Sequence, residues 1–156
     1  MIKLFKIKVK VIKEVKRLME KKNEYYINQH SCFLLQYHLV LITKYRHPVI
    51  VDDLKETLIN YVNDYFIKYK LKILEINTDK DHIHIMFEAI PNINLANFIN
   101  GLKTGSSRYI RIRYKEFLGP FYWKPYFWSA SYFLGTVSEK STKIVANYIK
   151  NQSKDI

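Results

Sequence analysis

The chain has 156 residues, of which 48% are hydrophobic, so it is long enough for one domain with a substantial core. Lysine and arginine number 26 against 14 aspartates and glutamates, and the net charge of +12 favours nucleic acid or an acidic membrane surface as partner. A single cysteine, Cys32, excludes an intramolecular disulfide and favours a cytoplasmic location. Aromatic residues make up 15%, which favours nucleic acid, because single-stranded bases stack on exposed rings.

Residues 1–25 alternate lysine with apolar residues and contain no long apolar run. They predict neither a signal peptide nor a membrane span, and we expect no membrane partner. We interpret residues 1–25 as a basic strand and helix extension, and residues 26–156 as a single domain. Cys32 lies in an apolar run of that domain, so we expect it in the core.

The first predicted elements of this domain alternate strand and helix. Residues 31–43 are rich in strand formers, and residues 51–70 repeat apolar side chains at helical spacing. Residues 71–78 and 81–90 then form two strands joined by a short polar turn, which is typical of a hairpin.

A second long helix is predicted for residues 95–117, although Gly101 and Gly105 lower its helix propensity. After an aromatic loop come a strand at residues 131–137 and a last helix at residues 139–152. The order β-α-β-β-α-β-α predicts an α+β fold of ferredoxin-like type, an antiparallel sheet with helices packed on one face.

Two histidines lie one residue apart in the strand "DHIHIMFE". Strand side chains alternate, so His82 and His84 project together while Ile83 points to the other side. Their Cα atoms are about 6.5 Å apart, which lets two imidazoles converge on one ion. The alternative is a pair of core histidines whose nitrogens find hydrogen-bond partners inside the protein.

Two histidines do not complete a metal site. In the last helix Tyr148 and Gln152 are four residues apart and share a helix face, and Gln152 carries an oxygen that an ion accepts. A Tyr–Gln pair at this spacing is also common in half-exposed helix packing.

Five segments follow one another along the chain: "YHLVLITKYRHPVI", "DHIHIMFE", "LKTGSSRYIR", "SYFLGTV" and "NYIKNQ". Together they closely resemble the TnpA-like transposases of small insertion sequences, the single-tyrosine branch of the histidine–hydrophobic–histidine nucleases. Ala130 and Ser138 depart from the family pattern, which has a basic or glycine residue and a glycine there. These departures concern hinge behaviour and DNA specificity.

The resemblance implies a DNA transposase that cleaves and rejoins single-stranded DNA at hairpin-bearing element ends and works as a homodimer. It implies that Tyr148 is the nucleophile, and that His82, His84 and Gln152 hold a divalent ion. Two imidazoles and an amide oxygen suit Mg²⁺ or Mn²⁺ better than a closed zinc site. Attack by the phenol leaves a 5′-phosphotyrosine and a free 3′-OH.

DNA contacts are expected from six basic side chains: Lys44, Arg46, Lys103, Arg108, Arg111 and Arg113. Two alternatives remain open. One is a rolling-circle or mobilisation nicking enzyme that uses the same chemistry. The other is a basic module that binds nucleic acid without cutting it, with His82 and His84 as core residues.

Overall fold

The computed structural model describes residues 20–22, 25–27, 29–137 and 147–151. Its main sheet has four antiparallel strands in the order β5-β6-β4-β7. The strands are β4 (Leu35–Ile42), β5 (Lys72–Thr78), β6 (His82–Ala89) and β7 (Phe133–Thr136). Helix α2 (Asp52–Lys68) connects β4 to β5, and α3 (Leu95–Arg113) lies between β6 and β7. The predicted ferredoxin-like α+β fold is confirmed.

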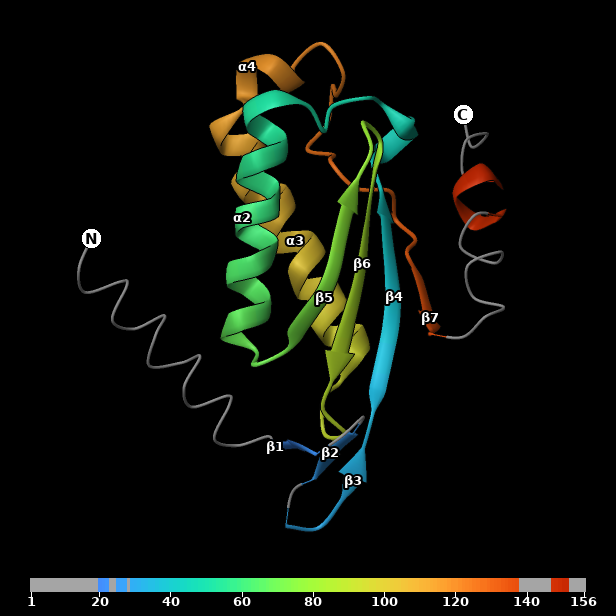
Figure 1. The fold of residues 1–156 in the computed structure, drawn as a ribbon. Helices are drawn as coiled ribbons and strands as arrows, with labels where there is room; N and C mark the ends of the chain where they lie inside the picture. Colours follow the sequence, from blue (N-terminus) through green and yellow to red (C-terminus); the bar gives the residue numbers. More distant parts are fainter. Residues whose placement is uncertain (1–19, 23–24, 28, 138–146, 152–156) are drawn as a thin grey trace, which may run out of the picture.

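The two faces of the sheet differ because successive side chains along each strand point to opposite sides. Leu39 and Leu41 of β4 and the fully buried Ile83 and Ile85 of β6 face the core with α2 and α3. Val40 and Ile42 of β4 alternate with these leucines and point to the opposite face. Figure 1 shows α2 and α3 on one side of the sheet and the helical residues 147–151 on the other.

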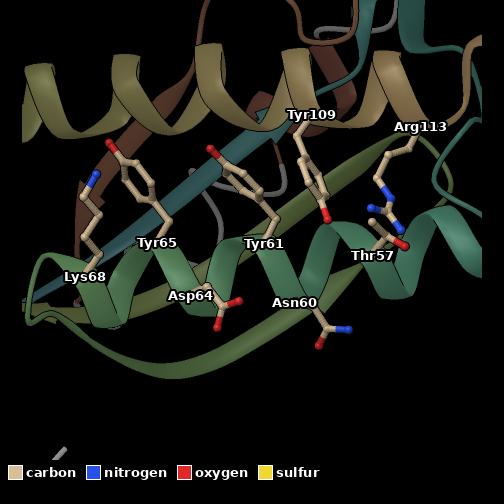
Figure 2. A pocket seen from close by; sticks show the side chains of 8 residues that line it. All are labelled: Thr57, Asn60, Tyr61, Asp64, Tyr65, Lys68, Tyr109 and Arg113. Carbon is tan, nitrogen blue, oxygen red and sulfur yellow. The ribbon is translucent and has the colours of Figure 1, made fainter. Parts of the chain in front are cut away.

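Helix α2 packs on the sheet through side chains four residues apart: Leu54, Leu58, Val62 and Phe66. Each fully buried side chain of this kind contributes about 1.5 to 3 kcal/mol relative to leaving it exposed. Tyr61 and Tyr65 leave α2 on its adjacent face and point toward α3, as Figure 2 shows. The tyrosines of α2 therefore pack between α2 and α3, and they do not contribute to the face of α2 that covers the sheet.

Helix α3 is continuous through Gly101 and Gly105, and both glycines have a role in its packing against α2. A Cβ atom on Gly101 would overlap the Tyr65 hydroxyl, and one on Gly105 would overlap the Tyr61 hydroxyl. Both pairs are four residues apart on their helices, so each tyrosine meets one glycine. The glycines give the two helices room for tyrosine rings between them.

The predicted helix 95–117 is interrupted. Helix α3 ends at Arg113, Tyr114 adopts non-helical angles (φ −116°, ψ 32°), and the short helix α4 (Lys115–Leu118) follows. The Tyr114 hydroxyl shares a 2.6 Å hydrogen bond with Thr57 on α2. The aromatic loop then returns to the sheet, where Trp128 bridges to Thr43 and closes the end of the core.

Three short strands form a second sheet: β1 (Glu20–Lys22), β2 (Tyr25–Ile27) and β3 (Cys32–Phe33). The strand predicted from 31 to 43 is thus divided at Leu34 into β3 and β4. Cys32 is exposed, so its expected core position is wrong: it lies on a two-residue strand away from the main sheet. Residues 1–19 lie outside the described residues, and the division at residue 25 stays a prediction.

The buried Tyr26 ties the second sheet to the main one, since its hydroxyl donates to the buried carboxylate of Glu88 on β6. Gln36 of β4 also donates to Glu88, at 3.0 Å. In the described part of the chain no helix has the length and apolar character needed to cross a membrane.

Candidate active site

The side chains of His82 and His84 project together, as predicted, and they lie on the sheet face opposite α2 and α3. In the β4–β6 ladder Ile42 pairs with His82, and Val40 pairs with His84. The side chain of His82 keeps 18% of its surface exposed, whereas Ile83 between the two histidines is fully buried. The pair is therefore open to a ligand from one side only.

Asp81 fixes the orientation of His82. The His82 Nδ1 donates to Asp81 Oδ1 at 2.7 Å, and Arg46 Nε donates to Asp81 Oδ2 at 2.7 Å. Burial by itself raises the pKa of Asp81, but the hydrogen bonds from Arg46 and His82 outweigh it and hold that pKa below its usual value. A carboxylate only accepts, so Nδ1 of His82 carries the proton and Nε2 is left with a lone pair for a metal.

His84 has a partner that sequence reasoning missed. His38 on β4, only 8% exposed, places its Nδ1 2.8 Å from His84 Nε2, and the two rings stack with centroids 5.0 Å apart. Burial, followed by the neighbouring His38, lowers the pKa of His84, which favours the neutral imidazole that metals bind. His38 is the diagonal neighbour of His84, and this relation is visible only once the β4–β6 register is known.

Tyr148 lies on the same face of the sheet as the histidines. It packs with Ile149 against Val40 and Ile42, the cross-strand partners of His84 and His82. Its ring is 5.3 Å from the ring of Phe133 on β7, and its hydroxyl shares a 3.2 Å hydrogen bond with Ser131.

Arg46 joins the helical segment to the histidine end of the sheet. While its Nε binds Asp81, its Nη1 donates to the carbonyl oxygen of Ile149 at 2.7 Å. One guanidinium thus contacts both the residue that orients His82 and the residue after Tyr148. Gln152, the predicted third ligand, lies outside the described residues.

The chemistry of the donor set fits a divalent ion. Two imidazoles project from one face, one oriented through a carboxylate and the other kept neutral by burial. Among the described residues no group of three or more His, Cys, Asp or Glu side chains is placed to hold a metal ion. The pair therefore needs a ligand from another residue type or from the substrate.

The six basic residues predicted to bind DNA lie in different environments. Arg46 is ion-paired at 2.7 Å with Asp81. Lys103 donates to the carbonyl oxygen of Ala130 at 2.7 Å, and burial lowers its pKa. The guanidinium of Arg113 stacks 5.2 Å from the ring of Tyr109.

The other three lie on η1 and α3. Lys44, in the 3₁₀ helix η1 (Lys44–Arg46), lies 5.0 Å from the ring of Tyr45. Arg108 is exposed on α3, and Arg111 lines a cavity beside α4. The prediction that all six contact DNA stays a prediction.

Comparison with known proteins decides the family. Residues 31–152 match the family described as "Transposase IS200 like". The chain belongs to this family. It is 30% identical over 120 residues to the ISDra2 transposase TnpA of Deinococcus radiodurans, which covers 77% of this chain and 85% of that protein.

Two further relatives agree. A transposase for insertion sequence element IS200 from Salmonella typhimurium is 29% identical over 125 residues, 79% of this chain and 80% of the relative. A crystal structure of a Deinococcus radiodurans protein superposes with a TM-score of 0.74 at 29% identity. It covers 81% of this chain and 96% of that one. The chain is thus an IS200-like tyrosine transposase, an enzyme that cuts and transfers DNA.

Proposed function

We propose that this transposase cleaves and rejoins single-stranded DNA at insertion-sequence ends through a 5′-phosphotyrosine on Tyr148. The observation that carries the proposal is the packing of Tyr148 against Val40 and Ile42, whose cross-strand partners are His84 and His82. A phenol and a pair of metal-binding imidazoles on one sheet face are the two groups that such a reaction needs.

His82, His84 and Gln152 are the residues that would hold Mg²⁺ or Mn²⁺. When bound, a divalent ion withdraws charge from a scissile phosphate and offsets the charge that develops during attack. Asp81 keeps His82 Nε2 unprotonated, and burial keeps His84 neutral. Coordination through His84 Nε2 requires that its hydrogen bond with His38 open, so His38 competes for the same nitrogen.

In the proposed step the Tyr148 phenolic oxygen forms a bond to phosphorus, and the bond from phosphorus to the 3′ oxygen breaks. The phenol gives up its proton, and the departing 3′ oxygen takes one to become a free 3′-OH. Ser131, hydrogen-bonded to the Tyr148 hydroxyl, orients the phenol. Because the phosphodiester energy is kept, a different 3′-OH can attack the linkage and rejoin the strands.

The family resemblance supports two partners for this reaction. One is single-stranded DNA with hairpin ends, and the other is a second copy of the chain in a homodimer. Light scattering of the purified protein measures its molar mass and so tests the homodimer directly. A monomer at all concentrations that support cleavage would remove the dimer from the proposal.

The central test is covalent capture. Wild-type protein, Mg²⁺ and a single-stranded element end should give a protein–DNA adduct on a denaturing gel, and Tyr148→Phe should give none, because the nucleophilic oxygen is missing. Tyr109→Phe is the matched control, since Tyr109 lies between α2 and α3 on the opposite side of the sheet. An adduct from Tyr148→Phe at the wild-type level would show that another residue is the nucleophile.

A further inference from the structure

A basic cavity of about 490 Å³ lies where α3, α4 and the aromatic loop meet. Three cationic side chains line it: Arg111, Lys115 and Lys124. Tyr122 and Tyr126 supply aromatic walls, and no acidic residue is among the lining. We call this cavity the α4 pocket. Its charge favours an anion, and its rings favour a planar group.

Trp123 stands at the edge of the α4 pocket with 74% of its surface exposed. Lys124 holds its ammonium 4.4 Å from the indole centroid, and Tyr126 meets the indole edge-on at 6.4 Å. Nearby Ile112 is 69% exposed. An exposed indole backed by a lysine can stack on a nucleobase on its free face while the cations bind phosphate.

The α4 pocket lies at the histidine end of the sheet. The Tyr122 hydroxyl donates to the Lys44 carbonyl at 3.1 Å, and the Lys44 ammonium is 5.1 Å from the Tyr126 ring. Lys44 follows Ile42, the partner of His82, by two residues, a span of at most about 7 Å. Figure 1 shows α4, η1 and the β5–β6 turn at the same end of the sheet.

We propose that the α4 pocket binds a nucleotide of the single strand beside the cleavage position, with its phosphate on Arg111, Lys115 and Lys124 and its base on Trp123. This inference rests on the proposed single-stranded substrate. A single strand is favoured over a duplex because only unpaired bases offer a free face to an exposed ring.

The groove between α2 and α3 is the competing surface, and the structure argues against it. Its Tyr61 and Tyr65 rings point toward α3 and already contact other rings, Tyr61 that of Tyr109 at 5.2 Å and Tyr65 that of Phe98 at 5.1 Å between centroids. The groove also carries the carboxylate of Asp64, whose negative charge disfavours a phosphate. It provides a control surface.

The test measures binding of a fluorescein-labelled oligothymidylate in EDTA, where no cutting takes place. Trp123→Ala should weaken binding about 5- to 100-fold, and Trp123→Phe should recover most of it. Lys124→Ala should weaken binding and lower the salt slope by about 0.7. Lys68→Ala removes the same charge from a lysine that stacks 5.4 Å from Tyr69 in the control groove, and should leave affinity unchanged.

Three outcomes would overturn the inference: no effect of Trp123→Ala, equal losses for Lys124→Ala and Lys68→Ala, or an equal loss of affinity for a blunt duplex. The last result would make the cavity a duplex phosphate site. Adduct formation is measured separately with Mg²⁺. If wild type forms no adduct while Trp123→Ala still weakens binding, the pocket stands and the proposed cleavage falls.

Discussion

Asp81 is the residue on which the geometry of the site depends most. Its two oxygens bind different partners, His82 at one and Arg46 at the other. A carboxylate behind a metal-binding histidine sets which nitrogen carries the proton, and it typically changes metal affinity by about 10- to 100-fold. His82 therefore depends on a neighbour that is itself held in place by an arginine.

We expect Asp81→Asn to weaken Mn²⁺ binding by about 10- to 100-fold, because an amide neither orients His82 as strongly nor pairs with Arg46. Isothermal titration calorimetry measures this. Asp79→Asn is the control, since Asp79 lies two residues earlier in an exposed turn and accepts from the Lys80 backbone. Equal affinities for wild type and Asp81→Asn would contradict the role given to this carboxylate.

At the scale of elements, the contact of α2 with α3 depends on tyrosines facing glycines. Helix propensity alone favours alanine over glycine by about 1 kcal/mol. At Gly105 the Tyr61 hydroxyl occupies the space that a methyl group would need. For the replacement of Gly105 by alanine, helix propensity is therefore stabilising and packing is destabilising.

Gly105→Ala is expected to lower the free energy of unfolding by about 1 to 2 kcal/mol, because the overlap with Tyr61 outweighs the gain in propensity. Denaturant titration followed by circular dichroism measures it. Adding Tyr61→Phe to this variant removes the overlapping hydroxyl and should restore most of the lost free energy of unfolding. Gly119→Ala, where a Cβ meets its nearest atoms at 3.5 Å, should cost nothing. A destabilisation as large at Gly119 as at Gly105 would point to backbone effects instead.

The tyrosines between α2 and α3 also predict that the protein loses stability at high pH. Burial, followed by the hydrogen bond and charge of Tyr69, raises the pKa of Tyr65 well above its usual value near 10, and burial also raises that of Tyr61. A raised pKa in the folded state means stability that is present below pH 10 and lost as pH rises above it. The melting temperature should fall above pH 10, and less steeply in Tyr65→Phe. An unchanged slope in Tyr65→Phe, with Tyr45→Phe as the exposed control, would contradict this.

Over the whole molecule, Arg46 connects segments about a hundred residues apart. It contacts Asp81 at the start of β6 and the Ile149 carbonyl beside Tyr148. The DNA contact predicted for Arg46 stays a prediction, and its two hydrogen bonds add a positioning role. The guanidinium makes both bonds at once because its donors form a planar fork, which a lysine ammonium lacks.

Arg46→Lys should slow adduct formation by about 10-fold or more at saturating DNA, because Tyr148 loses a fixed relation to the histidines. DNA affinity in EDTA should stay within about two-fold, since the charge is kept. Single-turnover gels and fluorescence anisotropy separate the two quantities. A loss of DNA affinity as large as the loss of rate would show that Arg46 acts through DNA binding and not through positioning.

Local pattern was sufficient for the element order and for the two faces of β6, because alternation along a strand depends only on neighbouring residues. The His82–His84 pair was predictable for the same reason. Where the chain departs from its pattern, a distant residue is responsible. Tyr114, bonded to Thr57, interrupts the expected helix, and Cys32 is exposed because β3 pairs away from the main sheet.

The amino-acid sequence by itself determined the family, the order of helices and strands along the chain and the candidates Tyr148, His82 and His84. Only the tertiary structure decided which side chains meet them: His38 at His84, Arg46 between Asp81 and Ile149, and a basic cavity beside α4. The physical reason is that these contacts depend on strand register and helix packing. Both are set by burial across the whole core, and the periodicity of one segment alone does not determine them.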